Sequence, residues 1–200
     1  SSSASVLYLV QVLSTKFPIK NMGVAEEFLG IRIIQRPGDI TIDQSHYVAE
    51  LVDDRYVKFV GSRNKATLPF INEYIPRDVS PLTVKESDYV ASFPYGEIVG
   101  CLLYLSVVTR IDISYAVGVL TRHVKCPTYA ACKAAARVLS YLSLTRKKGI
   151  RYSGHSLNFH AFTDSDWGSD QDTRRSTSGY LVVMAGAPVC WMSKLQPIVT

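Results

Sequence analysis

The sequence is poor in cysteine and contains none of the common short catalytic motifs. Its four cysteines form no CxxC pair and no secretory framework, which favours a reducing, intracellular setting. His123, Cys126 and Cys132 could be imagined as metal ligands, but no second pair accompanies them, and ordinary buried thiols are the favoured interpretation. A GxSxG elbow, a P-loop and an HExxH pair are also missing, so the chemistries that depend on them have no support.

Long apolar runs are missing as well. No stretch approaches the roughly 18 consecutive apolar residues that a membrane span requires, so we expect no membrane partner. The opening Ser-Ser-Ser-Ala-Ser has no basic region ahead of an apolar run, and no signal peptide is expected. With 47% hydrophobic and 20% charged residues the composition is that of a globular protein, and the missing initiator Met suggests a chain cut from a longer one.

Acidic residues are scarce in the second half of the chain. Residues 1–100 hold 10 Lys and Arg against 12 Asp and Glu, a net charge of −2, whereas residues 101–200 hold 12 against 5, a net charge of +7. Nine of those twelve cations fall between Arg110 and Arg151, where the only acid is Asp112. Such a band favours a polyanionic partner through counterion release, although a solvated helix face that keeps the protein soluble has the same pattern.

Residues 28–43 predict a β-hairpin. Both arms are rich in β-branched residues, and Pro37-Gly38-Asp39 supplies the turn between them. Gln44-Ser45 then offers a helix cap, and apolar residues follow at helical spacing. Asp53-Asp54 mimics the paired aspartates of a polymerase palm, but the pair lies inside this helical pattern, so we interpret both as solvated helix residues. Residues 61–95 carry several prolines and predict a long connector with short elements.

Apolar spacing predicts three helices in the middle of the chain. Two amphipathic segments run from Ile98 to Leu120, with a break near Thr109. Pro127-Thr128 opens a third helix at 129–145, and the Arg-Lys-Lys-Gly of residues 146–149 is a stop signal because it puts cations and a glycine at the helix end.

The last part of the chain predicts three strands and one candidate catalytic acid. Residues 157–163, 179–183 and 187–192 have strand patterns, with Gly186 near a turn. Asp164 ends the first of these strands, where it can be aimed at a site above the sheet, and Asp166 could contribute or could face water. Phosphodiester hydrolysis with two metal ions needs several such convergent carboxylates, whereas acids after strands are usually solvated.

Several segments, in order, resemble the copia class of retrotransposon Pol polyproteins over nearly the whole chain. They are residues 17–23 with 28–31, 44–47, 95–105 with 109–113, 127–142, and 162–167 with 174–180 and 191–196. The last set, which includes Phe-Thr-Asp-Ser-Asp-Trp at 162–167, is the most specific, since it is similar to the opening strands of the family's ribonuclease H domain. The resemblance implies a chain that runs from the end of a reverse transcriptase into that domain.

The resemblance implies an α+β fold with four regions. Residues 1–43 would end the palm with the primer-grip hairpin, 44–95 would be thumb-like, 96–152 would be a helical connection, and 153–200 would begin a truncated ribonuclease H-like domain as an antiparallel β-meander. The resemblance also implies an intracellular location, either in a cytoplasmic virus-like particle or in the nucleus. Its partners would be an RNA–DNA hybrid or another nucleic acid backbone and the remainder of the Pol polyprotein.

The resemblance also assigns roles to residues. Asp164 takes the place of the first catalytic, metal-binding carboxylate, with Asp166 as a further candidate ligand and Mg²⁺ as the cofactor of the complete parent enzyme, and Trp167 and Trp191 would be structural. The expected nucleic-acid contacts are Phe28, Leu29 and Gly30 at the primer strand, and Lys133, Arg137, Arg146, Lys147, Lys148, Arg174 and Arg175 at backbone phosphates.

The chain departs from the family pattern at a few positions. Ile111 stands where the family usually has Pro, Ala131 where it has His, and Ser143-Leu144 where it has Lys-Gly, which suggests a diverged copy. The Tyr-x-Asp-Asp hairpin of the polymerase would precede Ser1, and the next ribonuclease H acid would follow Thr200, so neither metal site would be complete and activity of the segment alone is not expected. The alternative is a non-catalytic, co-opted or decayed transposon-derived interaction protein.

Overall fold

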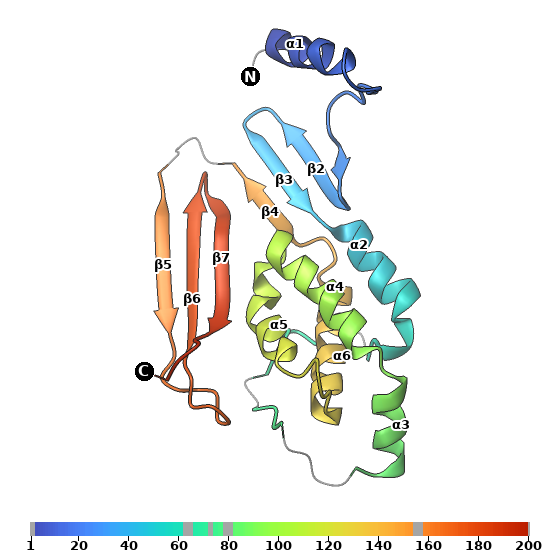
Figure 1. Ribbon diagram of the computed structural model, residues 1–200, viewed down its shortest axis with the longest axis vertical. Coiled ribbons are helices and arrows are strands. Elements are labelled where there is room, and N and C mark those ends of the chain that lie inside the picture. Colours follow the sequence, from blue (N-terminus) through green and yellow to red (C-terminus); the bar gives the residue numbers. More distant parts are fainter. Residues whose placement is uncertain (1–2, 62–65, 72–73, 78–81, 154–157, 200) are drawn as a thin grey trace.

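The computed structural model describes residues 3–61, 66–71, 74–77, 82–153 and 158–199, and these form a mixed α and β fold with two antiparallel sheets (Figure 1). The helices and strands are α1 (Ser3–Ser14), β1 (Glu27–Phe28), β2 (Ile31–Arg36), β3 (Asp39–Asp43), α2 (Ser45–Ala49), α3 (Val84–Ser92), α4 (Tyr95–Val108), α5 (Ser114–Thr121), α6 (Tyr129–Leu144), β4 (Gly149–Tyr152), β5 (His160–Ser165), β6 (Thr177–Met184) and β7 (Ala187–Leu195). A π-helical turn (Glu50–Arg55) and a 3-10 turn (Val57–Phe59) extend α2, and a second 3-10 turn (Ile111–Ile113) precedes α5.

The first sheet contains the predicted hairpin and one strand that the sequence pattern did not predict. β2 and β3 pair antiparallel around a two-residue turn, with Arg36 opposite Asp39 and Gly38 at a φ of 75°. β4, which lies more than a hundred residues further along the chain, pairs antiparallel with β3 so that Ile150 lies opposite Ile42. The sheet order is β1-β2-β3-β4, so the end of the predicted helical connection is a strand of the hairpin's sheet.

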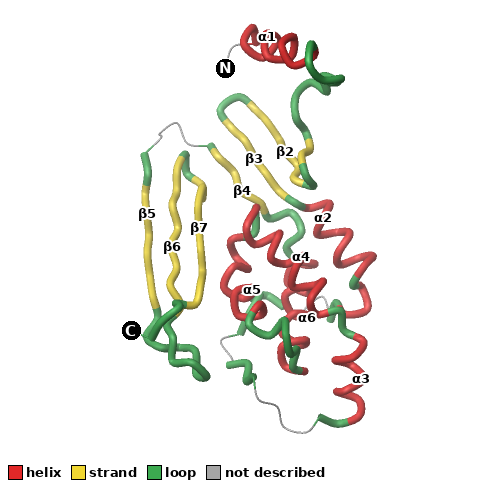
Figure 2. The backbone as a smooth tube through the Cα atoms, in the orientation of Figure 1, coloured by secondary structure: helices red, strands yellow, loops and turns green. Residues whose placement is uncertain are grey.

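The helical part has one continuous apolar core. Leu51 and Val52 from the turn after α2 pack with residues of α4, α5 and α6, among them Leu102, Leu120 and Leu139. Residue 95, where the expected thumb-like region ends, is the first residue of α4. Residues before and after it share this core, so the core continues across the expected boundary. Figure 2 shows these helices gathered into one body, with one sheet beside it and the other at its end.

The predicted helices of this body are confirmed, and their ends follow local chemistry. α4 and α5 are separated at Thr109, where the sequence predicts a break. The Thr128 hydroxyl caps α6 by accepting a hydrogen bond from the Ala131 backbone N–H at 3.1 Å. The long connector contains a nine-residue helix, α3, which begins with a capping box formed by Thr83 and Glu86. That pair is the sequence signal for α3 that the prediction missed.

The start of α2 differs from the prediction in detail. Gln44 precedes the helix, but its side chain makes no cap hydrogen bond; it is buried, and its Oε1 accepts from the Thr109 hydroxyl at 2.8 Å. The Asp43 carboxylate accepts from the Ser45 backbone N–H at 3.0 Å instead. The same carboxylate binds Arg32 at 2.7 Å, so one acid joins the end of β3 to both β2 and α2.

Arg110 is the largest fully buried side chain, with 1% of its surface exposed. Its Nε and Nη2 atoms donate to the two carboxylate oxygens of Asp112, each at 2.9 Å, and its other donors bind the carbonyl and hydroxyl oxygens of Thr145. Tyr141 donates to Asp112 at 2.7 Å and lies beside the guanidinium. This network ties the break between α4 and α5 to the end of α6, and with it to β4.

The second sheet is the predicted antiparallel meander, in the order β5-β6-β7. The turn between β6 and β7 consists of Ala185 and Gly186, with φ values of 51° and 78°, which suits a tight hairpin. The Trp191 ring nitrogen donates to the Ser106 carbonyl of α4 at 2.8 Å, and a Cβ at Gly118 of α5 would lie 3.4 Å from the Ser193 carbonyl. β7 therefore packs closely on the helical body.

Two apolar residues of the meander region and one whole helix stand in solvent. Phe162 on the outer strand β5 is 60% exposed, whereas Val182 and Val183 on the central strand β6 are half-buried. Trp167 is 91% exposed, so the structural role expected for it is wrong, whereas the one expected for Trp191 is confirmed. Figure 1 shows α1 standing clear of the other elements, and its Leu7, Tyr8 and Leu9 are exposed.

Among the described helices, no single one is long and apolar enough to cross a membrane. α3 and α4 together meet the length and composition of a span, but the pair is bent by 54°. Ile98, Val99, Leu102 and Leu105 of α4 are buried in the helical core, and that burial accounts for the apolar character of the helix.

We predict that Asp112→Asn lowers the free energy of unfolding by about 3 kcal/mol, because it leaves the buried Arg110 guanidinium without its charge partner. Asp54→Asn, at an exposed position, is the matched control and should change stability little. Urea unfolding followed by circular dichroism measures both variants, and equal midpoints for the two would contradict a structural role for the buried pair.

The same pair predicts how stability depends on pH. Burial alone would raise the pKa of Asp112, but the hydrogen bonds and charge of Arg110 and the Tyr141 hydroxyl outweigh it and hold the pKa below the ordinary value. The stabilisation is then fully present above the unfolded pKa of about 4 and is lost as the pH falls through the lower folded value. The stability gap between wild type and Asp112→Asn should therefore be wide at about pH 7 and narrow at about pH 3; a constant gap would contradict this.

Candidate nucleic-acid and metal-binding sites

Asp164 lies at the end of β5, as the sequence predicts, in the row of the meander that also contains Gly179 and Ser193. Its side chain is exposed. Among the described residues, the carboxylate accepts a hydrogen bond from the Ser165 backbone N–H at 2.9 Å. Asp164 and Asp166 are two residues apart, so they point to the same face of the sheet, and both line a cavity of about 570 Å³ between the meander, α5 and the segment around Tyr74.

Asp166 is more constrained than Asp164. Its carboxylate accepts hydrogen bonds from the Ser169 backbone N–H at 3.1 Å and from the Ser169 hydroxyl at 2.6 Å. Burial would raise its pKa, but these bonds and those from Thr177 outweigh that effect and lower it. Asp166 therefore stays ionised while holding the loop that follows β5, which leaves it less free than Asp164 to take an external ligand.

A third acid in this loop, Asp170, was not predicted from the sequence. It is buried and accepts from Arg122 of α5 at 2.7 Å and from the backbone and hydroxyl of Thr173 at 2.9 and 2.8 Å. Burial would raise its pKa, but the Thr173 hydrogen bonds and the charges of Arg122 and Arg77 lower it. Arg77 also pairs with Asp172 at 3.3 Å, so the loop is tied to both α5 and the connector.

The described residues do not complete a metal site. No group of three or more His, Cys, Asp or Glu side chains in the described part of the chain has the arrangement to hold an ion. Asp164 offers carboxylate oxygens of the kind that Mg²⁺ prefers, but Mg²⁺ keeps its water shell unless further oxygen ligands converge. Cys126 is exposed and Cys132 is buried, while burial lowers the pKa of His123, with a further lowering from Arg77.

Phe28, Leu29 and Gly30 form the tip of a tight hairpin between β1 and β2. Phe28 pairs with Ile31, and Leu29 and Gly30 both have positive φ, 51° and 72°, which is typical of a type I′ turn. Leu29 is unfavourable in this conformation, at a cost of about 1–2 kcal/mol, and the Tyr104 hydroxyl of α4 holds its carbonyl. Phe28 is 61% and Leu29 is 72% exposed, so this tip presents two apolar side chains to solvent.

Some of the cations predicted to bind phosphate are already hydrogen-bonded within the protein, and the others have no such partner. Arg146 donates to both Asp53 oxygens, at 2.5 and 2.8 Å, so Asp53 is an ion-pair partner and not the solvated residue that its sequence context suggests. Lys148 donates to the Tyr141 hydroxyl at 2.9 Å, and Arg137 to the Leu68 carbonyl at 3.2 Å. Of the predicted set, Lys133, Lys147, Arg174 and Arg175 have no side-chain hydrogen bond or ion pair within the part of the chain that the structure describes.

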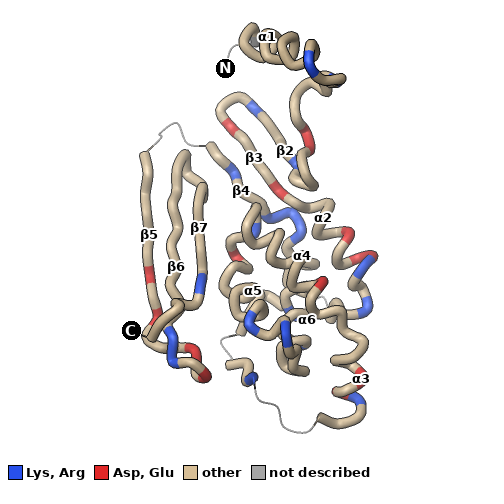
Figure 3. Tube along the Cα trace, viewed as in Figure 1, with Lys and Arg blue, Asp and Glu red and all other residues tan. Residues whose placement is uncertain are grey.

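The predicted sites lie in separate places. Figure 3 shows the cations after α6 beside β4, whereas the mixed acidic and basic loop after β5 lies at the far end of the meander. Lys133 and Arg137 lie along α6 beside another cavity. The structure thus brings Asp164 together with Asp166 and with residues 169–172 of the following loop around one cavity. Arg174 and Arg175 belong to the same loop but do not line that cavity, and Arg146, Lys147 and Lys148 lie elsewhere.

Comparison with known proteins finds relatives that match nearly the whole chain. The retrovirus-related Pol polyprotein from transposon TNT 1-94 of Nicotiana tabacum is 30% identical over 190 residues, which is 94% of this chain and 14% of that protein. The transposon Ty5-1 protein of Saccharomyces cerevisiae is 34% identical over 187 residues, 92% of this chain and 58% of that protein. The mitochondrial protein AtMg00810 of Arabidopsis thaliana is 33% identical over 205 residues, 100% of this chain and 80% of that protein.

These matches cover the chain far better than they cover the first two relatives. The chain spans a small part of the TNT 1-94 polyprotein and little more than half of the Ty5-1 protein. No family model matches the chain. No solved structure matches it significantly.

We predict that Asp170→Ala releases the loop after β5, because it removes the buried acceptor of Arg122 and Thr173. Hydrogen exchange at the Thr173 and Arg174 amides should become about tenfold faster or more, while the helical core stays protected. Gln171→Ala, in the same loop at an exposed position, is the control and should leave these rates unchanged. Unaltered exchange in Asp170→Ala would show that Asp170 does not anchor the loop.

Proposed function

Because the chain belongs to the copia-type retrotransposon Pol polyproteins, we propose that it is a nucleic-acid-binding segment of a reverse transcriptase with ribonuclease H activity. In the complete polyprotein it would contact an RNA–DNA hybrid. There it would contribute Asp164 to a site that cleaves the RNA strand. By itself it would bind nucleic acid without turnover.

The observation that carries this proposal is the position of Asp164. It is an exposed carboxylate at the end of a strand in an antiparallel meander, on the face that borders a cavity of about 570 Å³. Arg174 and Arg175 follow in the adjoining loop, without side-chain partners among the described residues, and Arg forks suit phosphate oxygens. A backbone phosphate at this end of the meander would thus meet cations from the loop and one carboxylate from β5.

Mg²⁺ is the proposed cofactor of the complete polyprotein. Asp164 would supply one of its ligands, and the remaining ones would come from parts of the polyprotein other than the described residues. Asp166 would serve chiefly to hold the loop, since Ser169 already occupies both of its oxygens.

The other nucleic-acid contacts are proposed at two further places. The exposed Phe28 and Leu29 side chains at the tip between β1 and β2 would contact the primer strand. Lys147 would contact a backbone phosphate, whereas Arg146 and Lys148 would have to share their hydrogen bonds with Asp53 and Tyr141. We propose a cytoplasmic particle or the nucleus as the location.

A second candidate function is supported by several Lys and Arg side chains that are already hydrogen-bonded within the protein. Arg137, Arg146 and Lys148 are engaged within the protein, so the basic band of the sequence does not become one continuous surface of free charge. In addition, the chain covers 80% of the short relative AtMg00810, a protein far smaller than the TNT 1-94 polyprotein. A transposon-derived interaction protein without catalysis is consistent with both observations.

Salt titration of hybrid binding tests the first proposal. We expect the isolated chain to bind a short RNA–DNA hybrid with an affinity that falls steeply with salt, and to cleave nothing when Mg²⁺ is added. Replacing Arg174 and Arg175 by Gln should reduce the slope of log K against log salt by about 0.9 for each lost phosphate contact. The double variant in which Lys85 and Lys125, both at exposed positions, are replaced by Gln is the charge-matched control.

The catalytic role of Asp164 needs the complete polyprotein. There, Asp164→Asn should abolish cleavage of the RNA strand with little change in hybrid affinity, whereas Asp88→Asn, at an exposed position on α3, should leave cleavage intact. Full cleavage by Asp164→Asn would refute the nuclease assignment. A flat hybrid-binding curve together with tight binding to a protein would favour the second candidate.

A further inference from the structure

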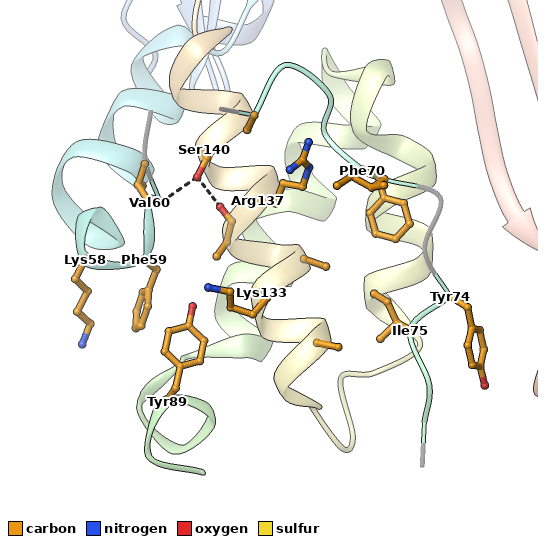
Figure 4. Close-up of a pocket in the computed structure, with 16 residues that line it drawn as sticks. Lys58, Phe59, Val60, Phe70, Tyr74, Ile75, Tyr89, Lys133, Arg137 and Ser140 are labelled. Carbon is orange, nitrogen blue, oxygen red and sulfur yellow. Dashed lines mark hydrogen bonds between the residues drawn. The ribbon is translucent and has the colours of Figure 1, made fainter. Parts of the chain in front are cut away.

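A second cavity, of about 550 Å³, lies over α6 and shares Phe70, Tyr74 and Ile75 with the cavity that Asp164 lines. Its floor is the outward face of α6, where Ala130, Ala134 and Ala136 leave room because their side chains are small. Figure 4 shows Phe59 and Tyr89 on one side of this floor and Phe70 and Ile75 on the other. We call this cavity the α6 groove.

The charged side chains among the described lining residues of the α6 groove are all positive. Lys58, Lys133 and Arg137 line it, and no Asp or Glu is present among its described lining residues. The Lys133 ammonium lies 5.8 Å from the centre of the Tyr89 ring, and Figure 4 shows it between Tyr89 and Arg137. A cluster of unneutralised cations beside an apolar cavity favours a ligand that carries both an anionic and an apolar part.

Aromatic side chains supply the apolar part of the lining. Phe59 and Tyr89 meet edge to face, with ring centroids 6.3 Å apart, and Phe70 packs similarly against Tyr115 at 5.8 Å. These contacts hold the rings in fixed orientations, so a flat ligand would meet a preformed surface rather than mobile side chains. Ser140 adds little to recognition, since its hydroxyl already accepts from the Gly61 N–H at 2.9 Å and donates to the Ala136 carbonyl.

We infer that the α6 groove binds one unpaired nucleotide of a single-stranded nucleic acid, with the base against the aromatic lining and the phosphate near Lys133 and Arg137. The volume lies within the range of about 300–1,000 Å³ that is usual for small-ligand pockets. Aromatic surfaces paired with cations are the combination by which proteins hold single strands without reading their sequence. Hybrid binding at the meander does not require this site, so the two proposals stand or fall separately.

Binding of a short oligothymidylate, followed by fluorescence anisotropy, tests the inference. Ala130→Trp places a ring in the groove from an exposed position on α6, without changing charge, and should weaken binding by about tenfold or more. Leu144→Trp, at the exposed end of the same helix, is its matched control and should bind like wild type. Lys133→Gln should weaken binding and reduce the salt slope by about 0.7, whereas Lys125→Gln, outside the groove, should not.

Two outcomes would overturn the inference. One is oligothymidylate binding that Ala130→Trp leaves unchanged while circular dichroism shows the variant to be folded. The other is displacement of the oligonucleotide by polyglutamate as effectively as by a second oligonucleotide, because that would make the groove a general surface for acidic chains. If Ala130→Trp loses the single strand and keeps the RNA–DNA hybrid, the groove is a site of its own. Hybrid binding that the variants of Arg174 and Arg175 leave unchanged would count against the meander site and not against the groove.

Discussion

The ion pair between the buried Arg110 and the partly exposed Asp112 is the interaction on which the rest of the structure depends. It closes the break between α4 and α5 and, through Thr145 and Tyr141, holds the end of α6 at the same point. β4 leaves from that end and joins the hairpin's sheet, and β7 packs on α4 and α5 on the other side. Both sheets therefore take their positions from helices that this pair holds together. A charge so fully buried needs its partner, since an unpaired guanidinium in the interior would be strongly destabilising.

Hydrogen bonds within the fold also explain why the basic band of the sequence suggests more free positive charge than the surface has. Three of the cations that a basic band suggests for phosphate binding are bound within the fold: Arg137 by a carbonyl, Arg146 by Asp53 and Lys148 by Tyr141. Each of these bonds links segments that are distant in sequence or closes the end of α6. The predicted cations that remain available lie in three places: Arg174 and Arg175 in the loop after β5, Lys133 in the α6 groove, and Lys147 after the end of α6. A single continuous track for a nucleic acid backbone is therefore not the arrangement that the described residues favour.

Local patterns predicted most of the elements, and their failures have identifiable causes. The hairpin at β2 and β3, the break at Thr109, the cap at Thr128 and the meander all depend on residues close in sequence, so composition and spacing were sufficient. β4 was missed because a four-residue strand has too little pattern, and its pairing with β3 is non-local. Asp170 was missed because only the fold brings Arg122 to it. Trp167 was expected to be structural, yet it is exposed, because a family motif does not say what lies over the side chain.

The sequence alone determined most of the helices and strands, the family and the position of Asp164 at a strand end, because each of these depends on short-range spacing or on motifs. Only the tertiary structure decided which acids and cations are free. Asp166 is held by Ser169, Asp53 by Arg146 and Asp170 by Arg122. Asp164 and Arg174, in contrast, are exposed, and Arg175 is half-buried. The α6 groove, too, exists only in three dimensions, since its walls come from the chain before α3 and from Tyr89 of α3, and its floor comes from α6. Packing brings together polar and charged groups that are distant in the chain, and their pairing cannot be predicted from local sequence patterns.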